Sequence, residues 1–150
     1  MQQRLNMYEL APDAYEAILG LENYARSKVD PTLFELIKTR ASMINGCAFC
    51  VDMHTTDALA QGEDIRRIVA LSAWRESSFF TDVERSVLAL TDAVTRLGEE
   101  GVTDDVWNTA RMHFGDSELT DLVMAIVAIN VWNRLAVTSH QATPPLKPRD

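Results

Sequence analysis

Apolar residues recur along most of the chain at spacings of three and four positions, the period of an amphipathic helix. No run of strand length alternates between apolar and polar residues. Read between their start and stop signals, the predicted helices cover residues 12–24, 31–45, 47–61, 63–74, 82–97, 104–114 and 118–137. The pattern therefore predicts an all-α fold, a helical bundle of about six or seven helices.

Several helix ends carry recognisable signals. Asp30 is suited to the N-cap and Pro31 to the first helical turn. Gly46 predicts a stop, because glycine readily takes the left-handed backbone of a helix terminus. Thr81 and Glu84 have the spacing of a capping box, in which each side chain accepts a backbone N–H of the first turn. These signals divide the chain at definite residues.

The last two helices are predicted to follow Thr103 and Ser117 as N-caps. Residues 118–137 are apolar over a wide arc, so this helix is expected to be the most buried. Charged and amide residues interrupt it, which argues against a membrane span of roughly 20 apolar residues. Residues 143–150 contain three prolines and are predicted to be a disordered tail, which leaves residues 1–142 as one domain.

Composition narrows the function classes. The chain has 150 residues, of which 47% are hydrophobic and 24% charged, as expected for one soluble globular domain. Its formal net charge is −8 and it has no concentrated Lys/Arg cluster, so nucleic-acid binding is not expected. No N-terminal targeting segment is visible, and we predict a cytoplasmic location.

Both cysteines lie in one stretch, Cys47-Ala48-Phe49-Cys50, with His54 four residues further on. Two cysteines scattered at random would be spaced this way only about 1% of the time. On a helix, His54 lies one turn from Cys50, close enough to share a proton with its thiol. A predicted helix start at Cys47 adds the positive end of the helix dipole, which also favours a thiolate. The spacing therefore predicts reactive thiols.

Glu35 is the candidate third group. It precedes Cys47 by twelve residues. Two antiparallel helices joined at Gly46 would bring the middle of the first beside the start of the second, where a carboxylate could orient the imidazole of His54. We therefore expect Glu35 and His54 to be in contact.

Other interpretations of the cysteine pair remain open at this point. Cys47 and Cys50 could be inert structural thiols, or half of a zinc site. A closed zinc site needs four ligands, and beyond His54 the remaining histidines, His113 and His140, lie far away in the sequence. Because no metal-ligand cluster or phosphate-binding loop is apparent, no cofactor is predicted. The aromatic residues, such as Trp132, are interpreted as core or subunit-interface residues.

The arrangement of Glu35, the Cys47–Cys50 pair and His54 resembles the core motif of the alkylhydroperoxidase AhpD family, part of the carboxymuconolactone decarboxylase-like superfamily. Residues 41–47, 57–62 and 130–134 resemble the same family. The resemblance implies an all-helical fold, a trimer or hexamer, and a thiol-dependent peroxidase that acts on hydrogen peroxide or organic hydroperoxides. It also implies an external thiol or dithiol reductant, possibly a protein. Asn133 and Arg134 are candidates for contacts with a neighbouring subunit.

By position in that motif, Cys50 resembles the cysteine that attacks peroxide and Cys47 the more accessible resolving cysteine. Glu35 and His54 resemble the proton relay. Phe49 stands where better-characterised AhpD proteins have a second histidine. This departure motivates the alternative of a redox sensor or disulfide-exchange accessory protein with little peroxide turnover. The decarboxylase branch lacks the cysteine pair, so a lactone decarboxylase is disfavoured.

Overall fold

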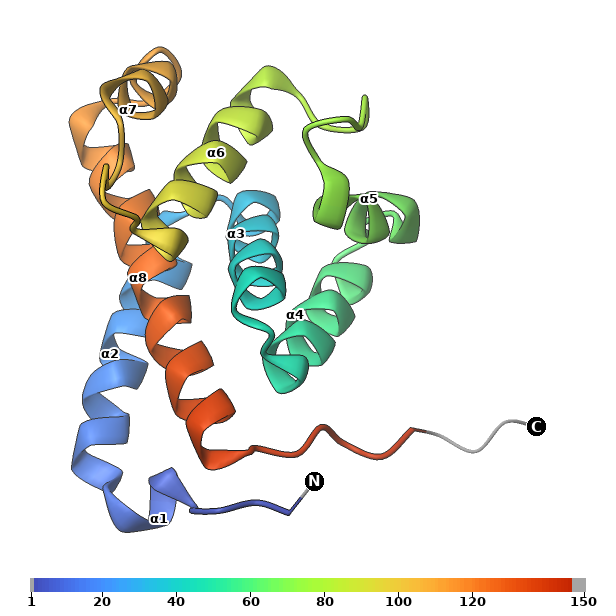
Figure 1. Ribbon diagram of the computed structural model, residues 1–150, viewed down its shortest axis with the longest axis vertical. Coiled ribbons are helices and arrows are strands. Elements are labelled where there is room, and N and C mark those ends of the chain that lie inside the picture. The colour runs from blue at the N-terminus through green and yellow to red at the C-terminus, as the bar shows by residue number, and fades with distance from the viewer. Residues whose placement is uncertain (1, 147–150) are drawn as a thin grey trace.

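The computed structural model describes residues 2–146, and the regular elements within this range are helices joined by turns and loops (Figure 1). In chain order the elements are α1 (Met7–Leu10), α2 (Pro12–Lys28), α3 (Pro31–Asn45), α4 (Ala48–Ala60), α5 (Ile65–Ala70), the 3-10 turn η1 (Leu71–Ala73), α6 (Asp82–Arg96), α7 (Asp104–Arg111) and α8 (Asp116–Ser139). The prediction of an all-α bundle is confirmed. All seven predicted helices are present, and the short α1 precedes them.

Helix α2 runs four residues beyond its predicted end, and the predicted helix 63–74 is divided into α5 and η1. Further differences from the predicted boundaries lie around α7 and α8. Helix α7 ends at Arg111, and α8 begins at Asp116 with Gly115 as its N-cap. Ser117 therefore lies inside the helix, and the Glu118 carboxylate accepts the Gly115 N–H at 2.9 Å. Thr103 occupies its N-cap position without a side-chain hydrogen bond. Of the predicted tail, residues 143–146 have no regular structure and 147–150 lie outside the described residues.

Helix α3 is the centre of the bundle (Figure 1). Its residues 34–42 are all buried, nine in succession, because α4, α6 and α8 pack around it. Helix α8 also buries nine residues, but these are spread over 24 positions. The expectation that the last helix is the most buried is therefore wrong. A prediction from hydropathy assigns charged residues to the surface, whereas Lys38 and Arg40 of α3 are buried in ion pairs with acidic residues of other helices.

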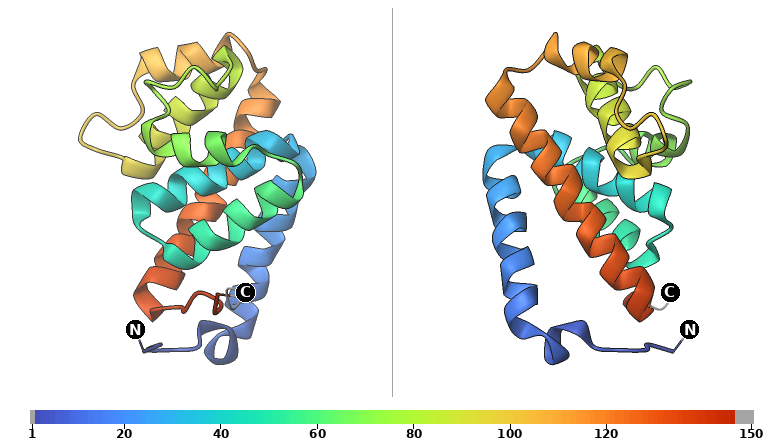
Figure 2. Two further views of the ribbon diagram at one scale, coloured as in Figure 1. Left: turned by 90° about the vertical axis from the view of Figure 1, so that its right-hand side faces the viewer. Right: turned by 60° about the vertical axis from the view of Figure 1, so that its left-hand side comes forward.

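Helix α8 has the length and apolar composition of a membrane span, the only such helix among residues 2–146. It runs beside α2 and also packs against α3 and α6 (Figure 2). Six of its nine buried positions, among them Leu119, Ile126 and Ile129, belong to the main hydrophobic cluster. The apolar arc that the sequence showed is thus used for packing within the bundle.

A buried ion pair joins α3 to α6. Arg40 donates two hydrogen bonds to Asp92, Nε to Oδ1 at 2.6 Å and Nη2 to Oδ2 at 3.0 Å. Burial by itself raises the pKa of Asp92, but the hydrogen bonds from Arg40 and Arg75 outweigh it and hold the pKa at about 2. The carboxylate of Asp92 is therefore ionised at neutral pH. Its ion pair with Arg40 holds the second half of α3 against α6.

The turn between α3 and α4 places the cysteines. Gly46 has a left-handed backbone (φ 67°), and the Cys47 N–H returns to the Ser42 carbonyl at 3.0 Å. Asn133 of α8 supports the turn: it accepts from Asn45 Nδ2 and donates to Ser42 Oγ, each at 2.9 Å. These partners lie within the chain, so the expectation of a subunit contact for Asn133 is wrong. Arg134 likewise bonds within α8, to the carbonyl of Asn130.

Candidate functional site

The cysteine pair lies at the first turn of α4. Cys47 is the N-cap, its sulfur accepts the Cys50 N–H at 3.3 Å, and the helix begins at Ala48. The two cysteines are joined in a disulfide, with their Cα atoms 5.4 Å apart. The predicted helix start is confirmed. Each cysteine is only 2% exposed, so the expectation that Cys47 is the more accessible one is wrong for the single chain.

Glu35 and His54 are in contact, as predicted from two antiparallel helices joined at Gly46. His54 Nδ1 lies 2.9 Å from Glu35 Oε2, and both side chains are buried. A carboxylate beside Nδ1 holds the proton on that nitrogen and fixes the ring. Nε2 is then left as the basic atom of the imidazole. His54 can therefore act as a base toward a group on its Nε2 side.

Cys50 and His54 line the same cavity, of about 270 Å³. Its remaining wall is mainly apolar and is formed by Tyr15, Leu19, Phe49, Met53, Trp132 and Ala136, with Glu22, Arg26 and Gln141 as polar members. A small molecule in this cavity would reach the Cys50 side of the pair and the imidazole together. Trp132 is half-buried here, so one of the aromatic residues interpreted as core belongs to the site.

Cys47 lines a different cavity, of about 500 Å³, at the ends of α3 and α8. Gly46, Ala48 and Val137 contribute to its wall, and so does His140, although it lies far from the thiols in the sequence. Phe49 lines both cavities. Ala136 and Gln141 line both as well, so the two cavities adjoin, one reaching Cys47 and the other Cys50.

A group of paired charges extends the site toward α2. Arg26 lies 3.6 Å from Glu22 Oε1 and 3.6 Å from Glu35 Oε1. Glu22 also accepts from Lys38, whose side chain is fully buried, and from the Trp132 indole N–H at 3.1 Å. Burial lowers the pKa of Lys38, although the Glu22 carboxylate opposes that shift. These charges link α2 and α8 to the relay.

Sequence reasoning missed Glu22, Arg26 and Lys38. One signal existed: Lys38 falls on the same face of α3 as the buried Phe34 and Ala41, where a lysine needs a buried partner. Which acidic residue meets it depends on how α2 packs, and no local pattern gives that.

Within the described residues, the group of side chains that could together hold a metal ion is Glu35, His54 and Asp57, whose ligand atoms lie within 4.8 Å of one another. It contains neither cysteine, and the His113 and His140 side chains are not part of it. Arg26 already brings a positive charge beside Glu35. The two cysteines are bonded to each other instead.

Comparisons with known proteins indicate the family to which this chain is similar. The profile of the Carboxymuconolactone decarboxylase family matches residues 11–93. The uncharacterized protein YdfG of Bacillus subtilis is 40% identical over 138 residues, covering 91% of this chain and 94% of YdfG. The crystal structure of ATU0492 from Agrobacterium tumefaciens, a protein of unknown function provisionally described as the antioxidant defence protein AhpD, superposes with a TM-score of 0.94 at 43% identity. That superposition covers 97% of this chain and 100% of ATU0492.

A more distant structure shares the fold alone. The debrominase Bmp8 superposes with a TM-score of 0.78 at 18% identity, over 89% of this chain and 72% of Bmp8.

Proposed function

This chain belongs to the carboxymuconolactone decarboxylase family and is AhpD-like, and from that premise we propose that it is a thiol-dependent peroxidase. One observation carries the proposal. A Cys47–Cys50 pair that forms a disulfide lies one helical turn from a buried His54–Glu35 pair, and a single cavity reaches both Cys50 and His54. These are the groups needed to make a thiolate and to move its proton.

The proposed reaction begins with the reduced pair. His54 takes the proton from the Cys50 thiol, and the thiolate sulfur attacks one oxygen of the peroxide. The O–O bond breaks, its electron pair leaves with the second oxygen, and that oxygen is protonated by the imidazolium. Cys50 becomes a sulfenic acid, and the peroxide is reduced to an alcohol, or to water if it was hydrogen peroxide.

Cys47 then closes the cycle. Its thiol condenses with the sulfenic acid, which releases water and forms the Cys47–Cys50 disulfide. An external thiol or dithiol returns two electrons to the disulfide and is itself oxidised. The proposed reductant would approach Cys47 through the second cavity, which Cys47 lines. Such a cycle needs a reducing compartment, and we propose the cytoplasm.

The apolar wall of the Cys50 cavity supports an organic hydroperoxide as a substrate, with hydrogen peroxide as the smallest one that would fit. We also propose a homo-oligomer, a trimer or hexamer. Exposed apolar side chains on three helices, such as Leu59, Val69 and Val127, support this because a subunit contact would cover them without closing the cavities at the thiols. Sedimentation at micromolar concentration tests it, and a 16.8 kDa monomer would contradict it.

The roles of the two cysteines can be tested by trapping the intermediate. Reduced Cys47→Ser protein, treated with one equivalent of peroxide and a sulfenic-acid reagent, should carry the adduct on Cys50 by mass spectrometry. Cys50→Ser is the matched variant and should carry no adduct. An adduct on Cys47 of the second variant, with none on Cys50 of the first, would reverse the assignment and the role of His54.

Phe49 favours a second candidate, a redox sensor or disulfide-exchange accessory protein. It lines both cavities at the position of the second histidine of better-characterised AhpD proteins, so the relay has no imidazole there. A sensor would oxidise once and await a partner. Reduction of a protein disulfide without any peroxide would favour disulfide exchange.

A further inference from the structure

Two side-chain atoms among the described residues are buried and have no hydrogen-bond partner: Glu35 Oε1 and Thr39 Oγ1. Both residues lie on α3, one turn apart, and their exposed fractions are 3% and 1%. Leaving such groups unpaired is costly, so buried polar atoms are nearly always bonded to protein or to water. The partner of Glu35 Oε1 matters because the other carboxylate oxygen holds His54.

Glu35 and Thr39 line one cavity of about 250 Å³. This cavity lies between α3, the end of α4 and α5, and it shares no lining residue with either cavity at the thiols. A water molecule occupies about 30 Å³ of liquid, so the cavity has room for several. Polar groups on its wall, including Thr32 and Gln61, offer further hydrogen bonds.

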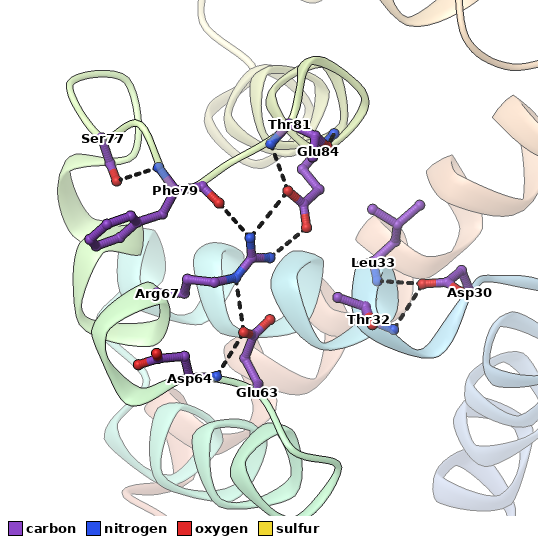
Figure 3. Close-up of polar contacts among 10 residues, drawn as sticks. All are labelled: Asp30, Thr32, Leu33, Glu63, Asp64, Arg67, Ser77, Phe79, Thr81 and Glu84. Atoms are coloured by element: carbon purple, nitrogen blue, oxygen red, sulfur yellow. Dashed lines mark hydrogen bonds and ion pairs between the residues drawn. The ribbon is translucent and has the colours of Figure 1, made fainter.

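The charged residues at this cavity are held by other partners (Figure 3). Arg67 donates to Glu63 Oε1 at 2.9 Å and also to Glu84 and the Phe79 carbonyl. Its guanidinium is thereby occupied by these three partners. Thr32 is fixed on the other side, because its N–H donates to the Asp30 side chain at 3.0 Å. The wall is thus ordered without using the free oxygens of Glu35 and Thr39.

We propose that this cavity is a hydration site of the relay, in which water bridges Glu35 Oε1 and Thr39 Oγ1 and connects the carboxylate to bulk solvent. Thr39 is then a positioning residue, acting on Cys50 through Glu35 and His54. Arg26, 3.6 Å from Glu35 Oε1, contributes charge but no hydrogen bond, which leaves that oxygen for water. The inference rests on the proposed role of the relay in activating the thiol.

The hydration site would serve the relay in two ways. A water that donates to Glu35 stabilises its ionised form, and the carboxylate in turn stabilises the imidazolium formed when His54 takes the Cys50 proton. The cavity also gives that proton a path to solvent that does not cross the substrate cavity. One proton leaves the thiol and one appears in bulk water, with no change of oxidation state.

Other charged groups lie around Glu35 and contribute to the electrostatic environment in which any pH profile of Cys50 is measured. From the helices around it these are Arg26 and Glu22 on α2, Lys38 on α3, His54 and Asp57 on α4, and Glu63 and Arg67 at the cavity wall. The substitutions chosen below leave all of them in place.

The test compares Thr39→Val, which keeps the shape and removes the hydroxyl, with Thr39→Ser, which restores it. Thr91→Val is the matched control: Thr91 is also fully buried in a helix, but its hydroxyl bonds its own helix at Val87 O, 2.8 Å away. The rate of Cys50 alkylation is measured against pH in reduced protein carrying Cys47→Ser. This readout needs no peroxide, so it is independent of whether the chain turns peroxide over.

Thr39→Val should lower the alkylation rate at neutral pH about three- to ten-fold, the effect of one hydrogen bond, and should move the midpoint of the profile upward. Thr39→Ser should restore both, and Thr91→Val should change neither. Equal profiles for Thr39→Val and the parent would overturn the inference. If Thr39→Val fails to fold, a high-resolution crystal structure of the unmodified protein decides: ordered water bonded to both oxygens supports the site, whereas a dry cavity or a cation in it refutes it.

Discussion

Replacing Asp92 with Asn tests the energetics that hold the central helix in place. The carboxylate is 3% exposed and lies among donors from several segments: Arg40 on α3, Trp74 and Arg75 after η1, and Arg96 on its own helix. The amide of Asn has nearly the same shape, so little packing is lost. What changes is the charge that faces Arg40.

The magnitude follows from two estimates. A pKa depressed from 3.8 to about 2 corresponds to roughly 2 kcal/mol of stabilisation at neutral pH. Breaking a buried ion pair by removing one partner costs about 3–5 kcal/mol, because the other charge stays buried. Arg40 keeps its hydrogen bond to the Leu71 carbonyl at 3.1 Å, which favours the lower end. We expect Asp92→Asn to lose about 3 kcal/mol.

Urea unfolding at pH 7 measures this loss, and thermal unfolding should show a fall in Tm of about 6–12 °C for a domain of this size. Asp116→Asn is the matched control. Asp116 is exposed, and this substitution removes a single 3.4 Å ion pair with Arg111, so the loss of unfolding free energy should be much smaller. A change within about 0.5 kcal/mol for Asp92→Asn would refute the reasoning, since that is the range of ordinary surface substitutions.

The pH dependence gives a second check on Asp92. Its folded-state pKa lies below the unfolded value, so its stabilisation is fully present above about pH 4 and is lost as the pH falls toward about 2. The difference in unfolding free energy between the parent and Asp92→Asn should therefore shrink over that window. A difference that stays constant down to pH 2 would mean that the charge of Asp92 is not its source.

Three further substitutions test the turn and the relay. Gly46→Ala should cost about 1 kcal/mol in urea unfolding, because the backbone there has φ 67° while nothing crowds a new Cβ; an unchanged midpoint would show that the turn relaxes. Asn133→Leu leaves the Ser42 hydroxyl without its donor and the Asn45 amide with Asn130 Oδ1 as its remaining acceptor, and it should cost about 2 kcal/mol by the same assay; a neutral effect would mean that water replaces the amide. Phe49→His places an imidazole between the two cavities and should raise steady-state peroxide turnover with a dithiol, and unchanged turnover would show that Phe49 is not limiting.

The helices and the contact of Glu35 with His54 could be predicted from the sequence because they depend on short-range chemistry. A stop at Gly46 and a start at Cys47 fix the reversal, and the reversal sets which residues of α3 and α4 meet. The amphipathic period needs no knowledge of distant segments. The same holds for the Cys47–Cys50 pair, whose spacing suits a disulfide at a helix start.

The burial of α3 could not be predicted, because its polar residues are satisfied by segments far away in the sequence. Lys38 meets Glu22 on α2, and Arg40 meets Asp92 on α6. A lysine or an arginine considered alone is expected at the protein surface. Only the packed bundle shows that Lys38 and Arg40 each have an acidic partner in the interior. The partners of Asn133, which are Asn45 and Ser42, are likewise distant in the sequence.

The most direct test of the central claim counts turnovers. Reduced protein at micromolar concentration is given a hundred-fold excess of an organic hydroperoxide and a dithiol reductant, and the peroxide consumed per chain is measured beside Cys50→Ser. A thiol peroxidase should consume many equivalents per chain while cycling through the Cys47–Cys50 disulfide, and Cys50→Ser should consume none above background. Consumption that stops at one equivalent per chain, with the dithiol still present, would contradict a peroxidase and leave the sensor.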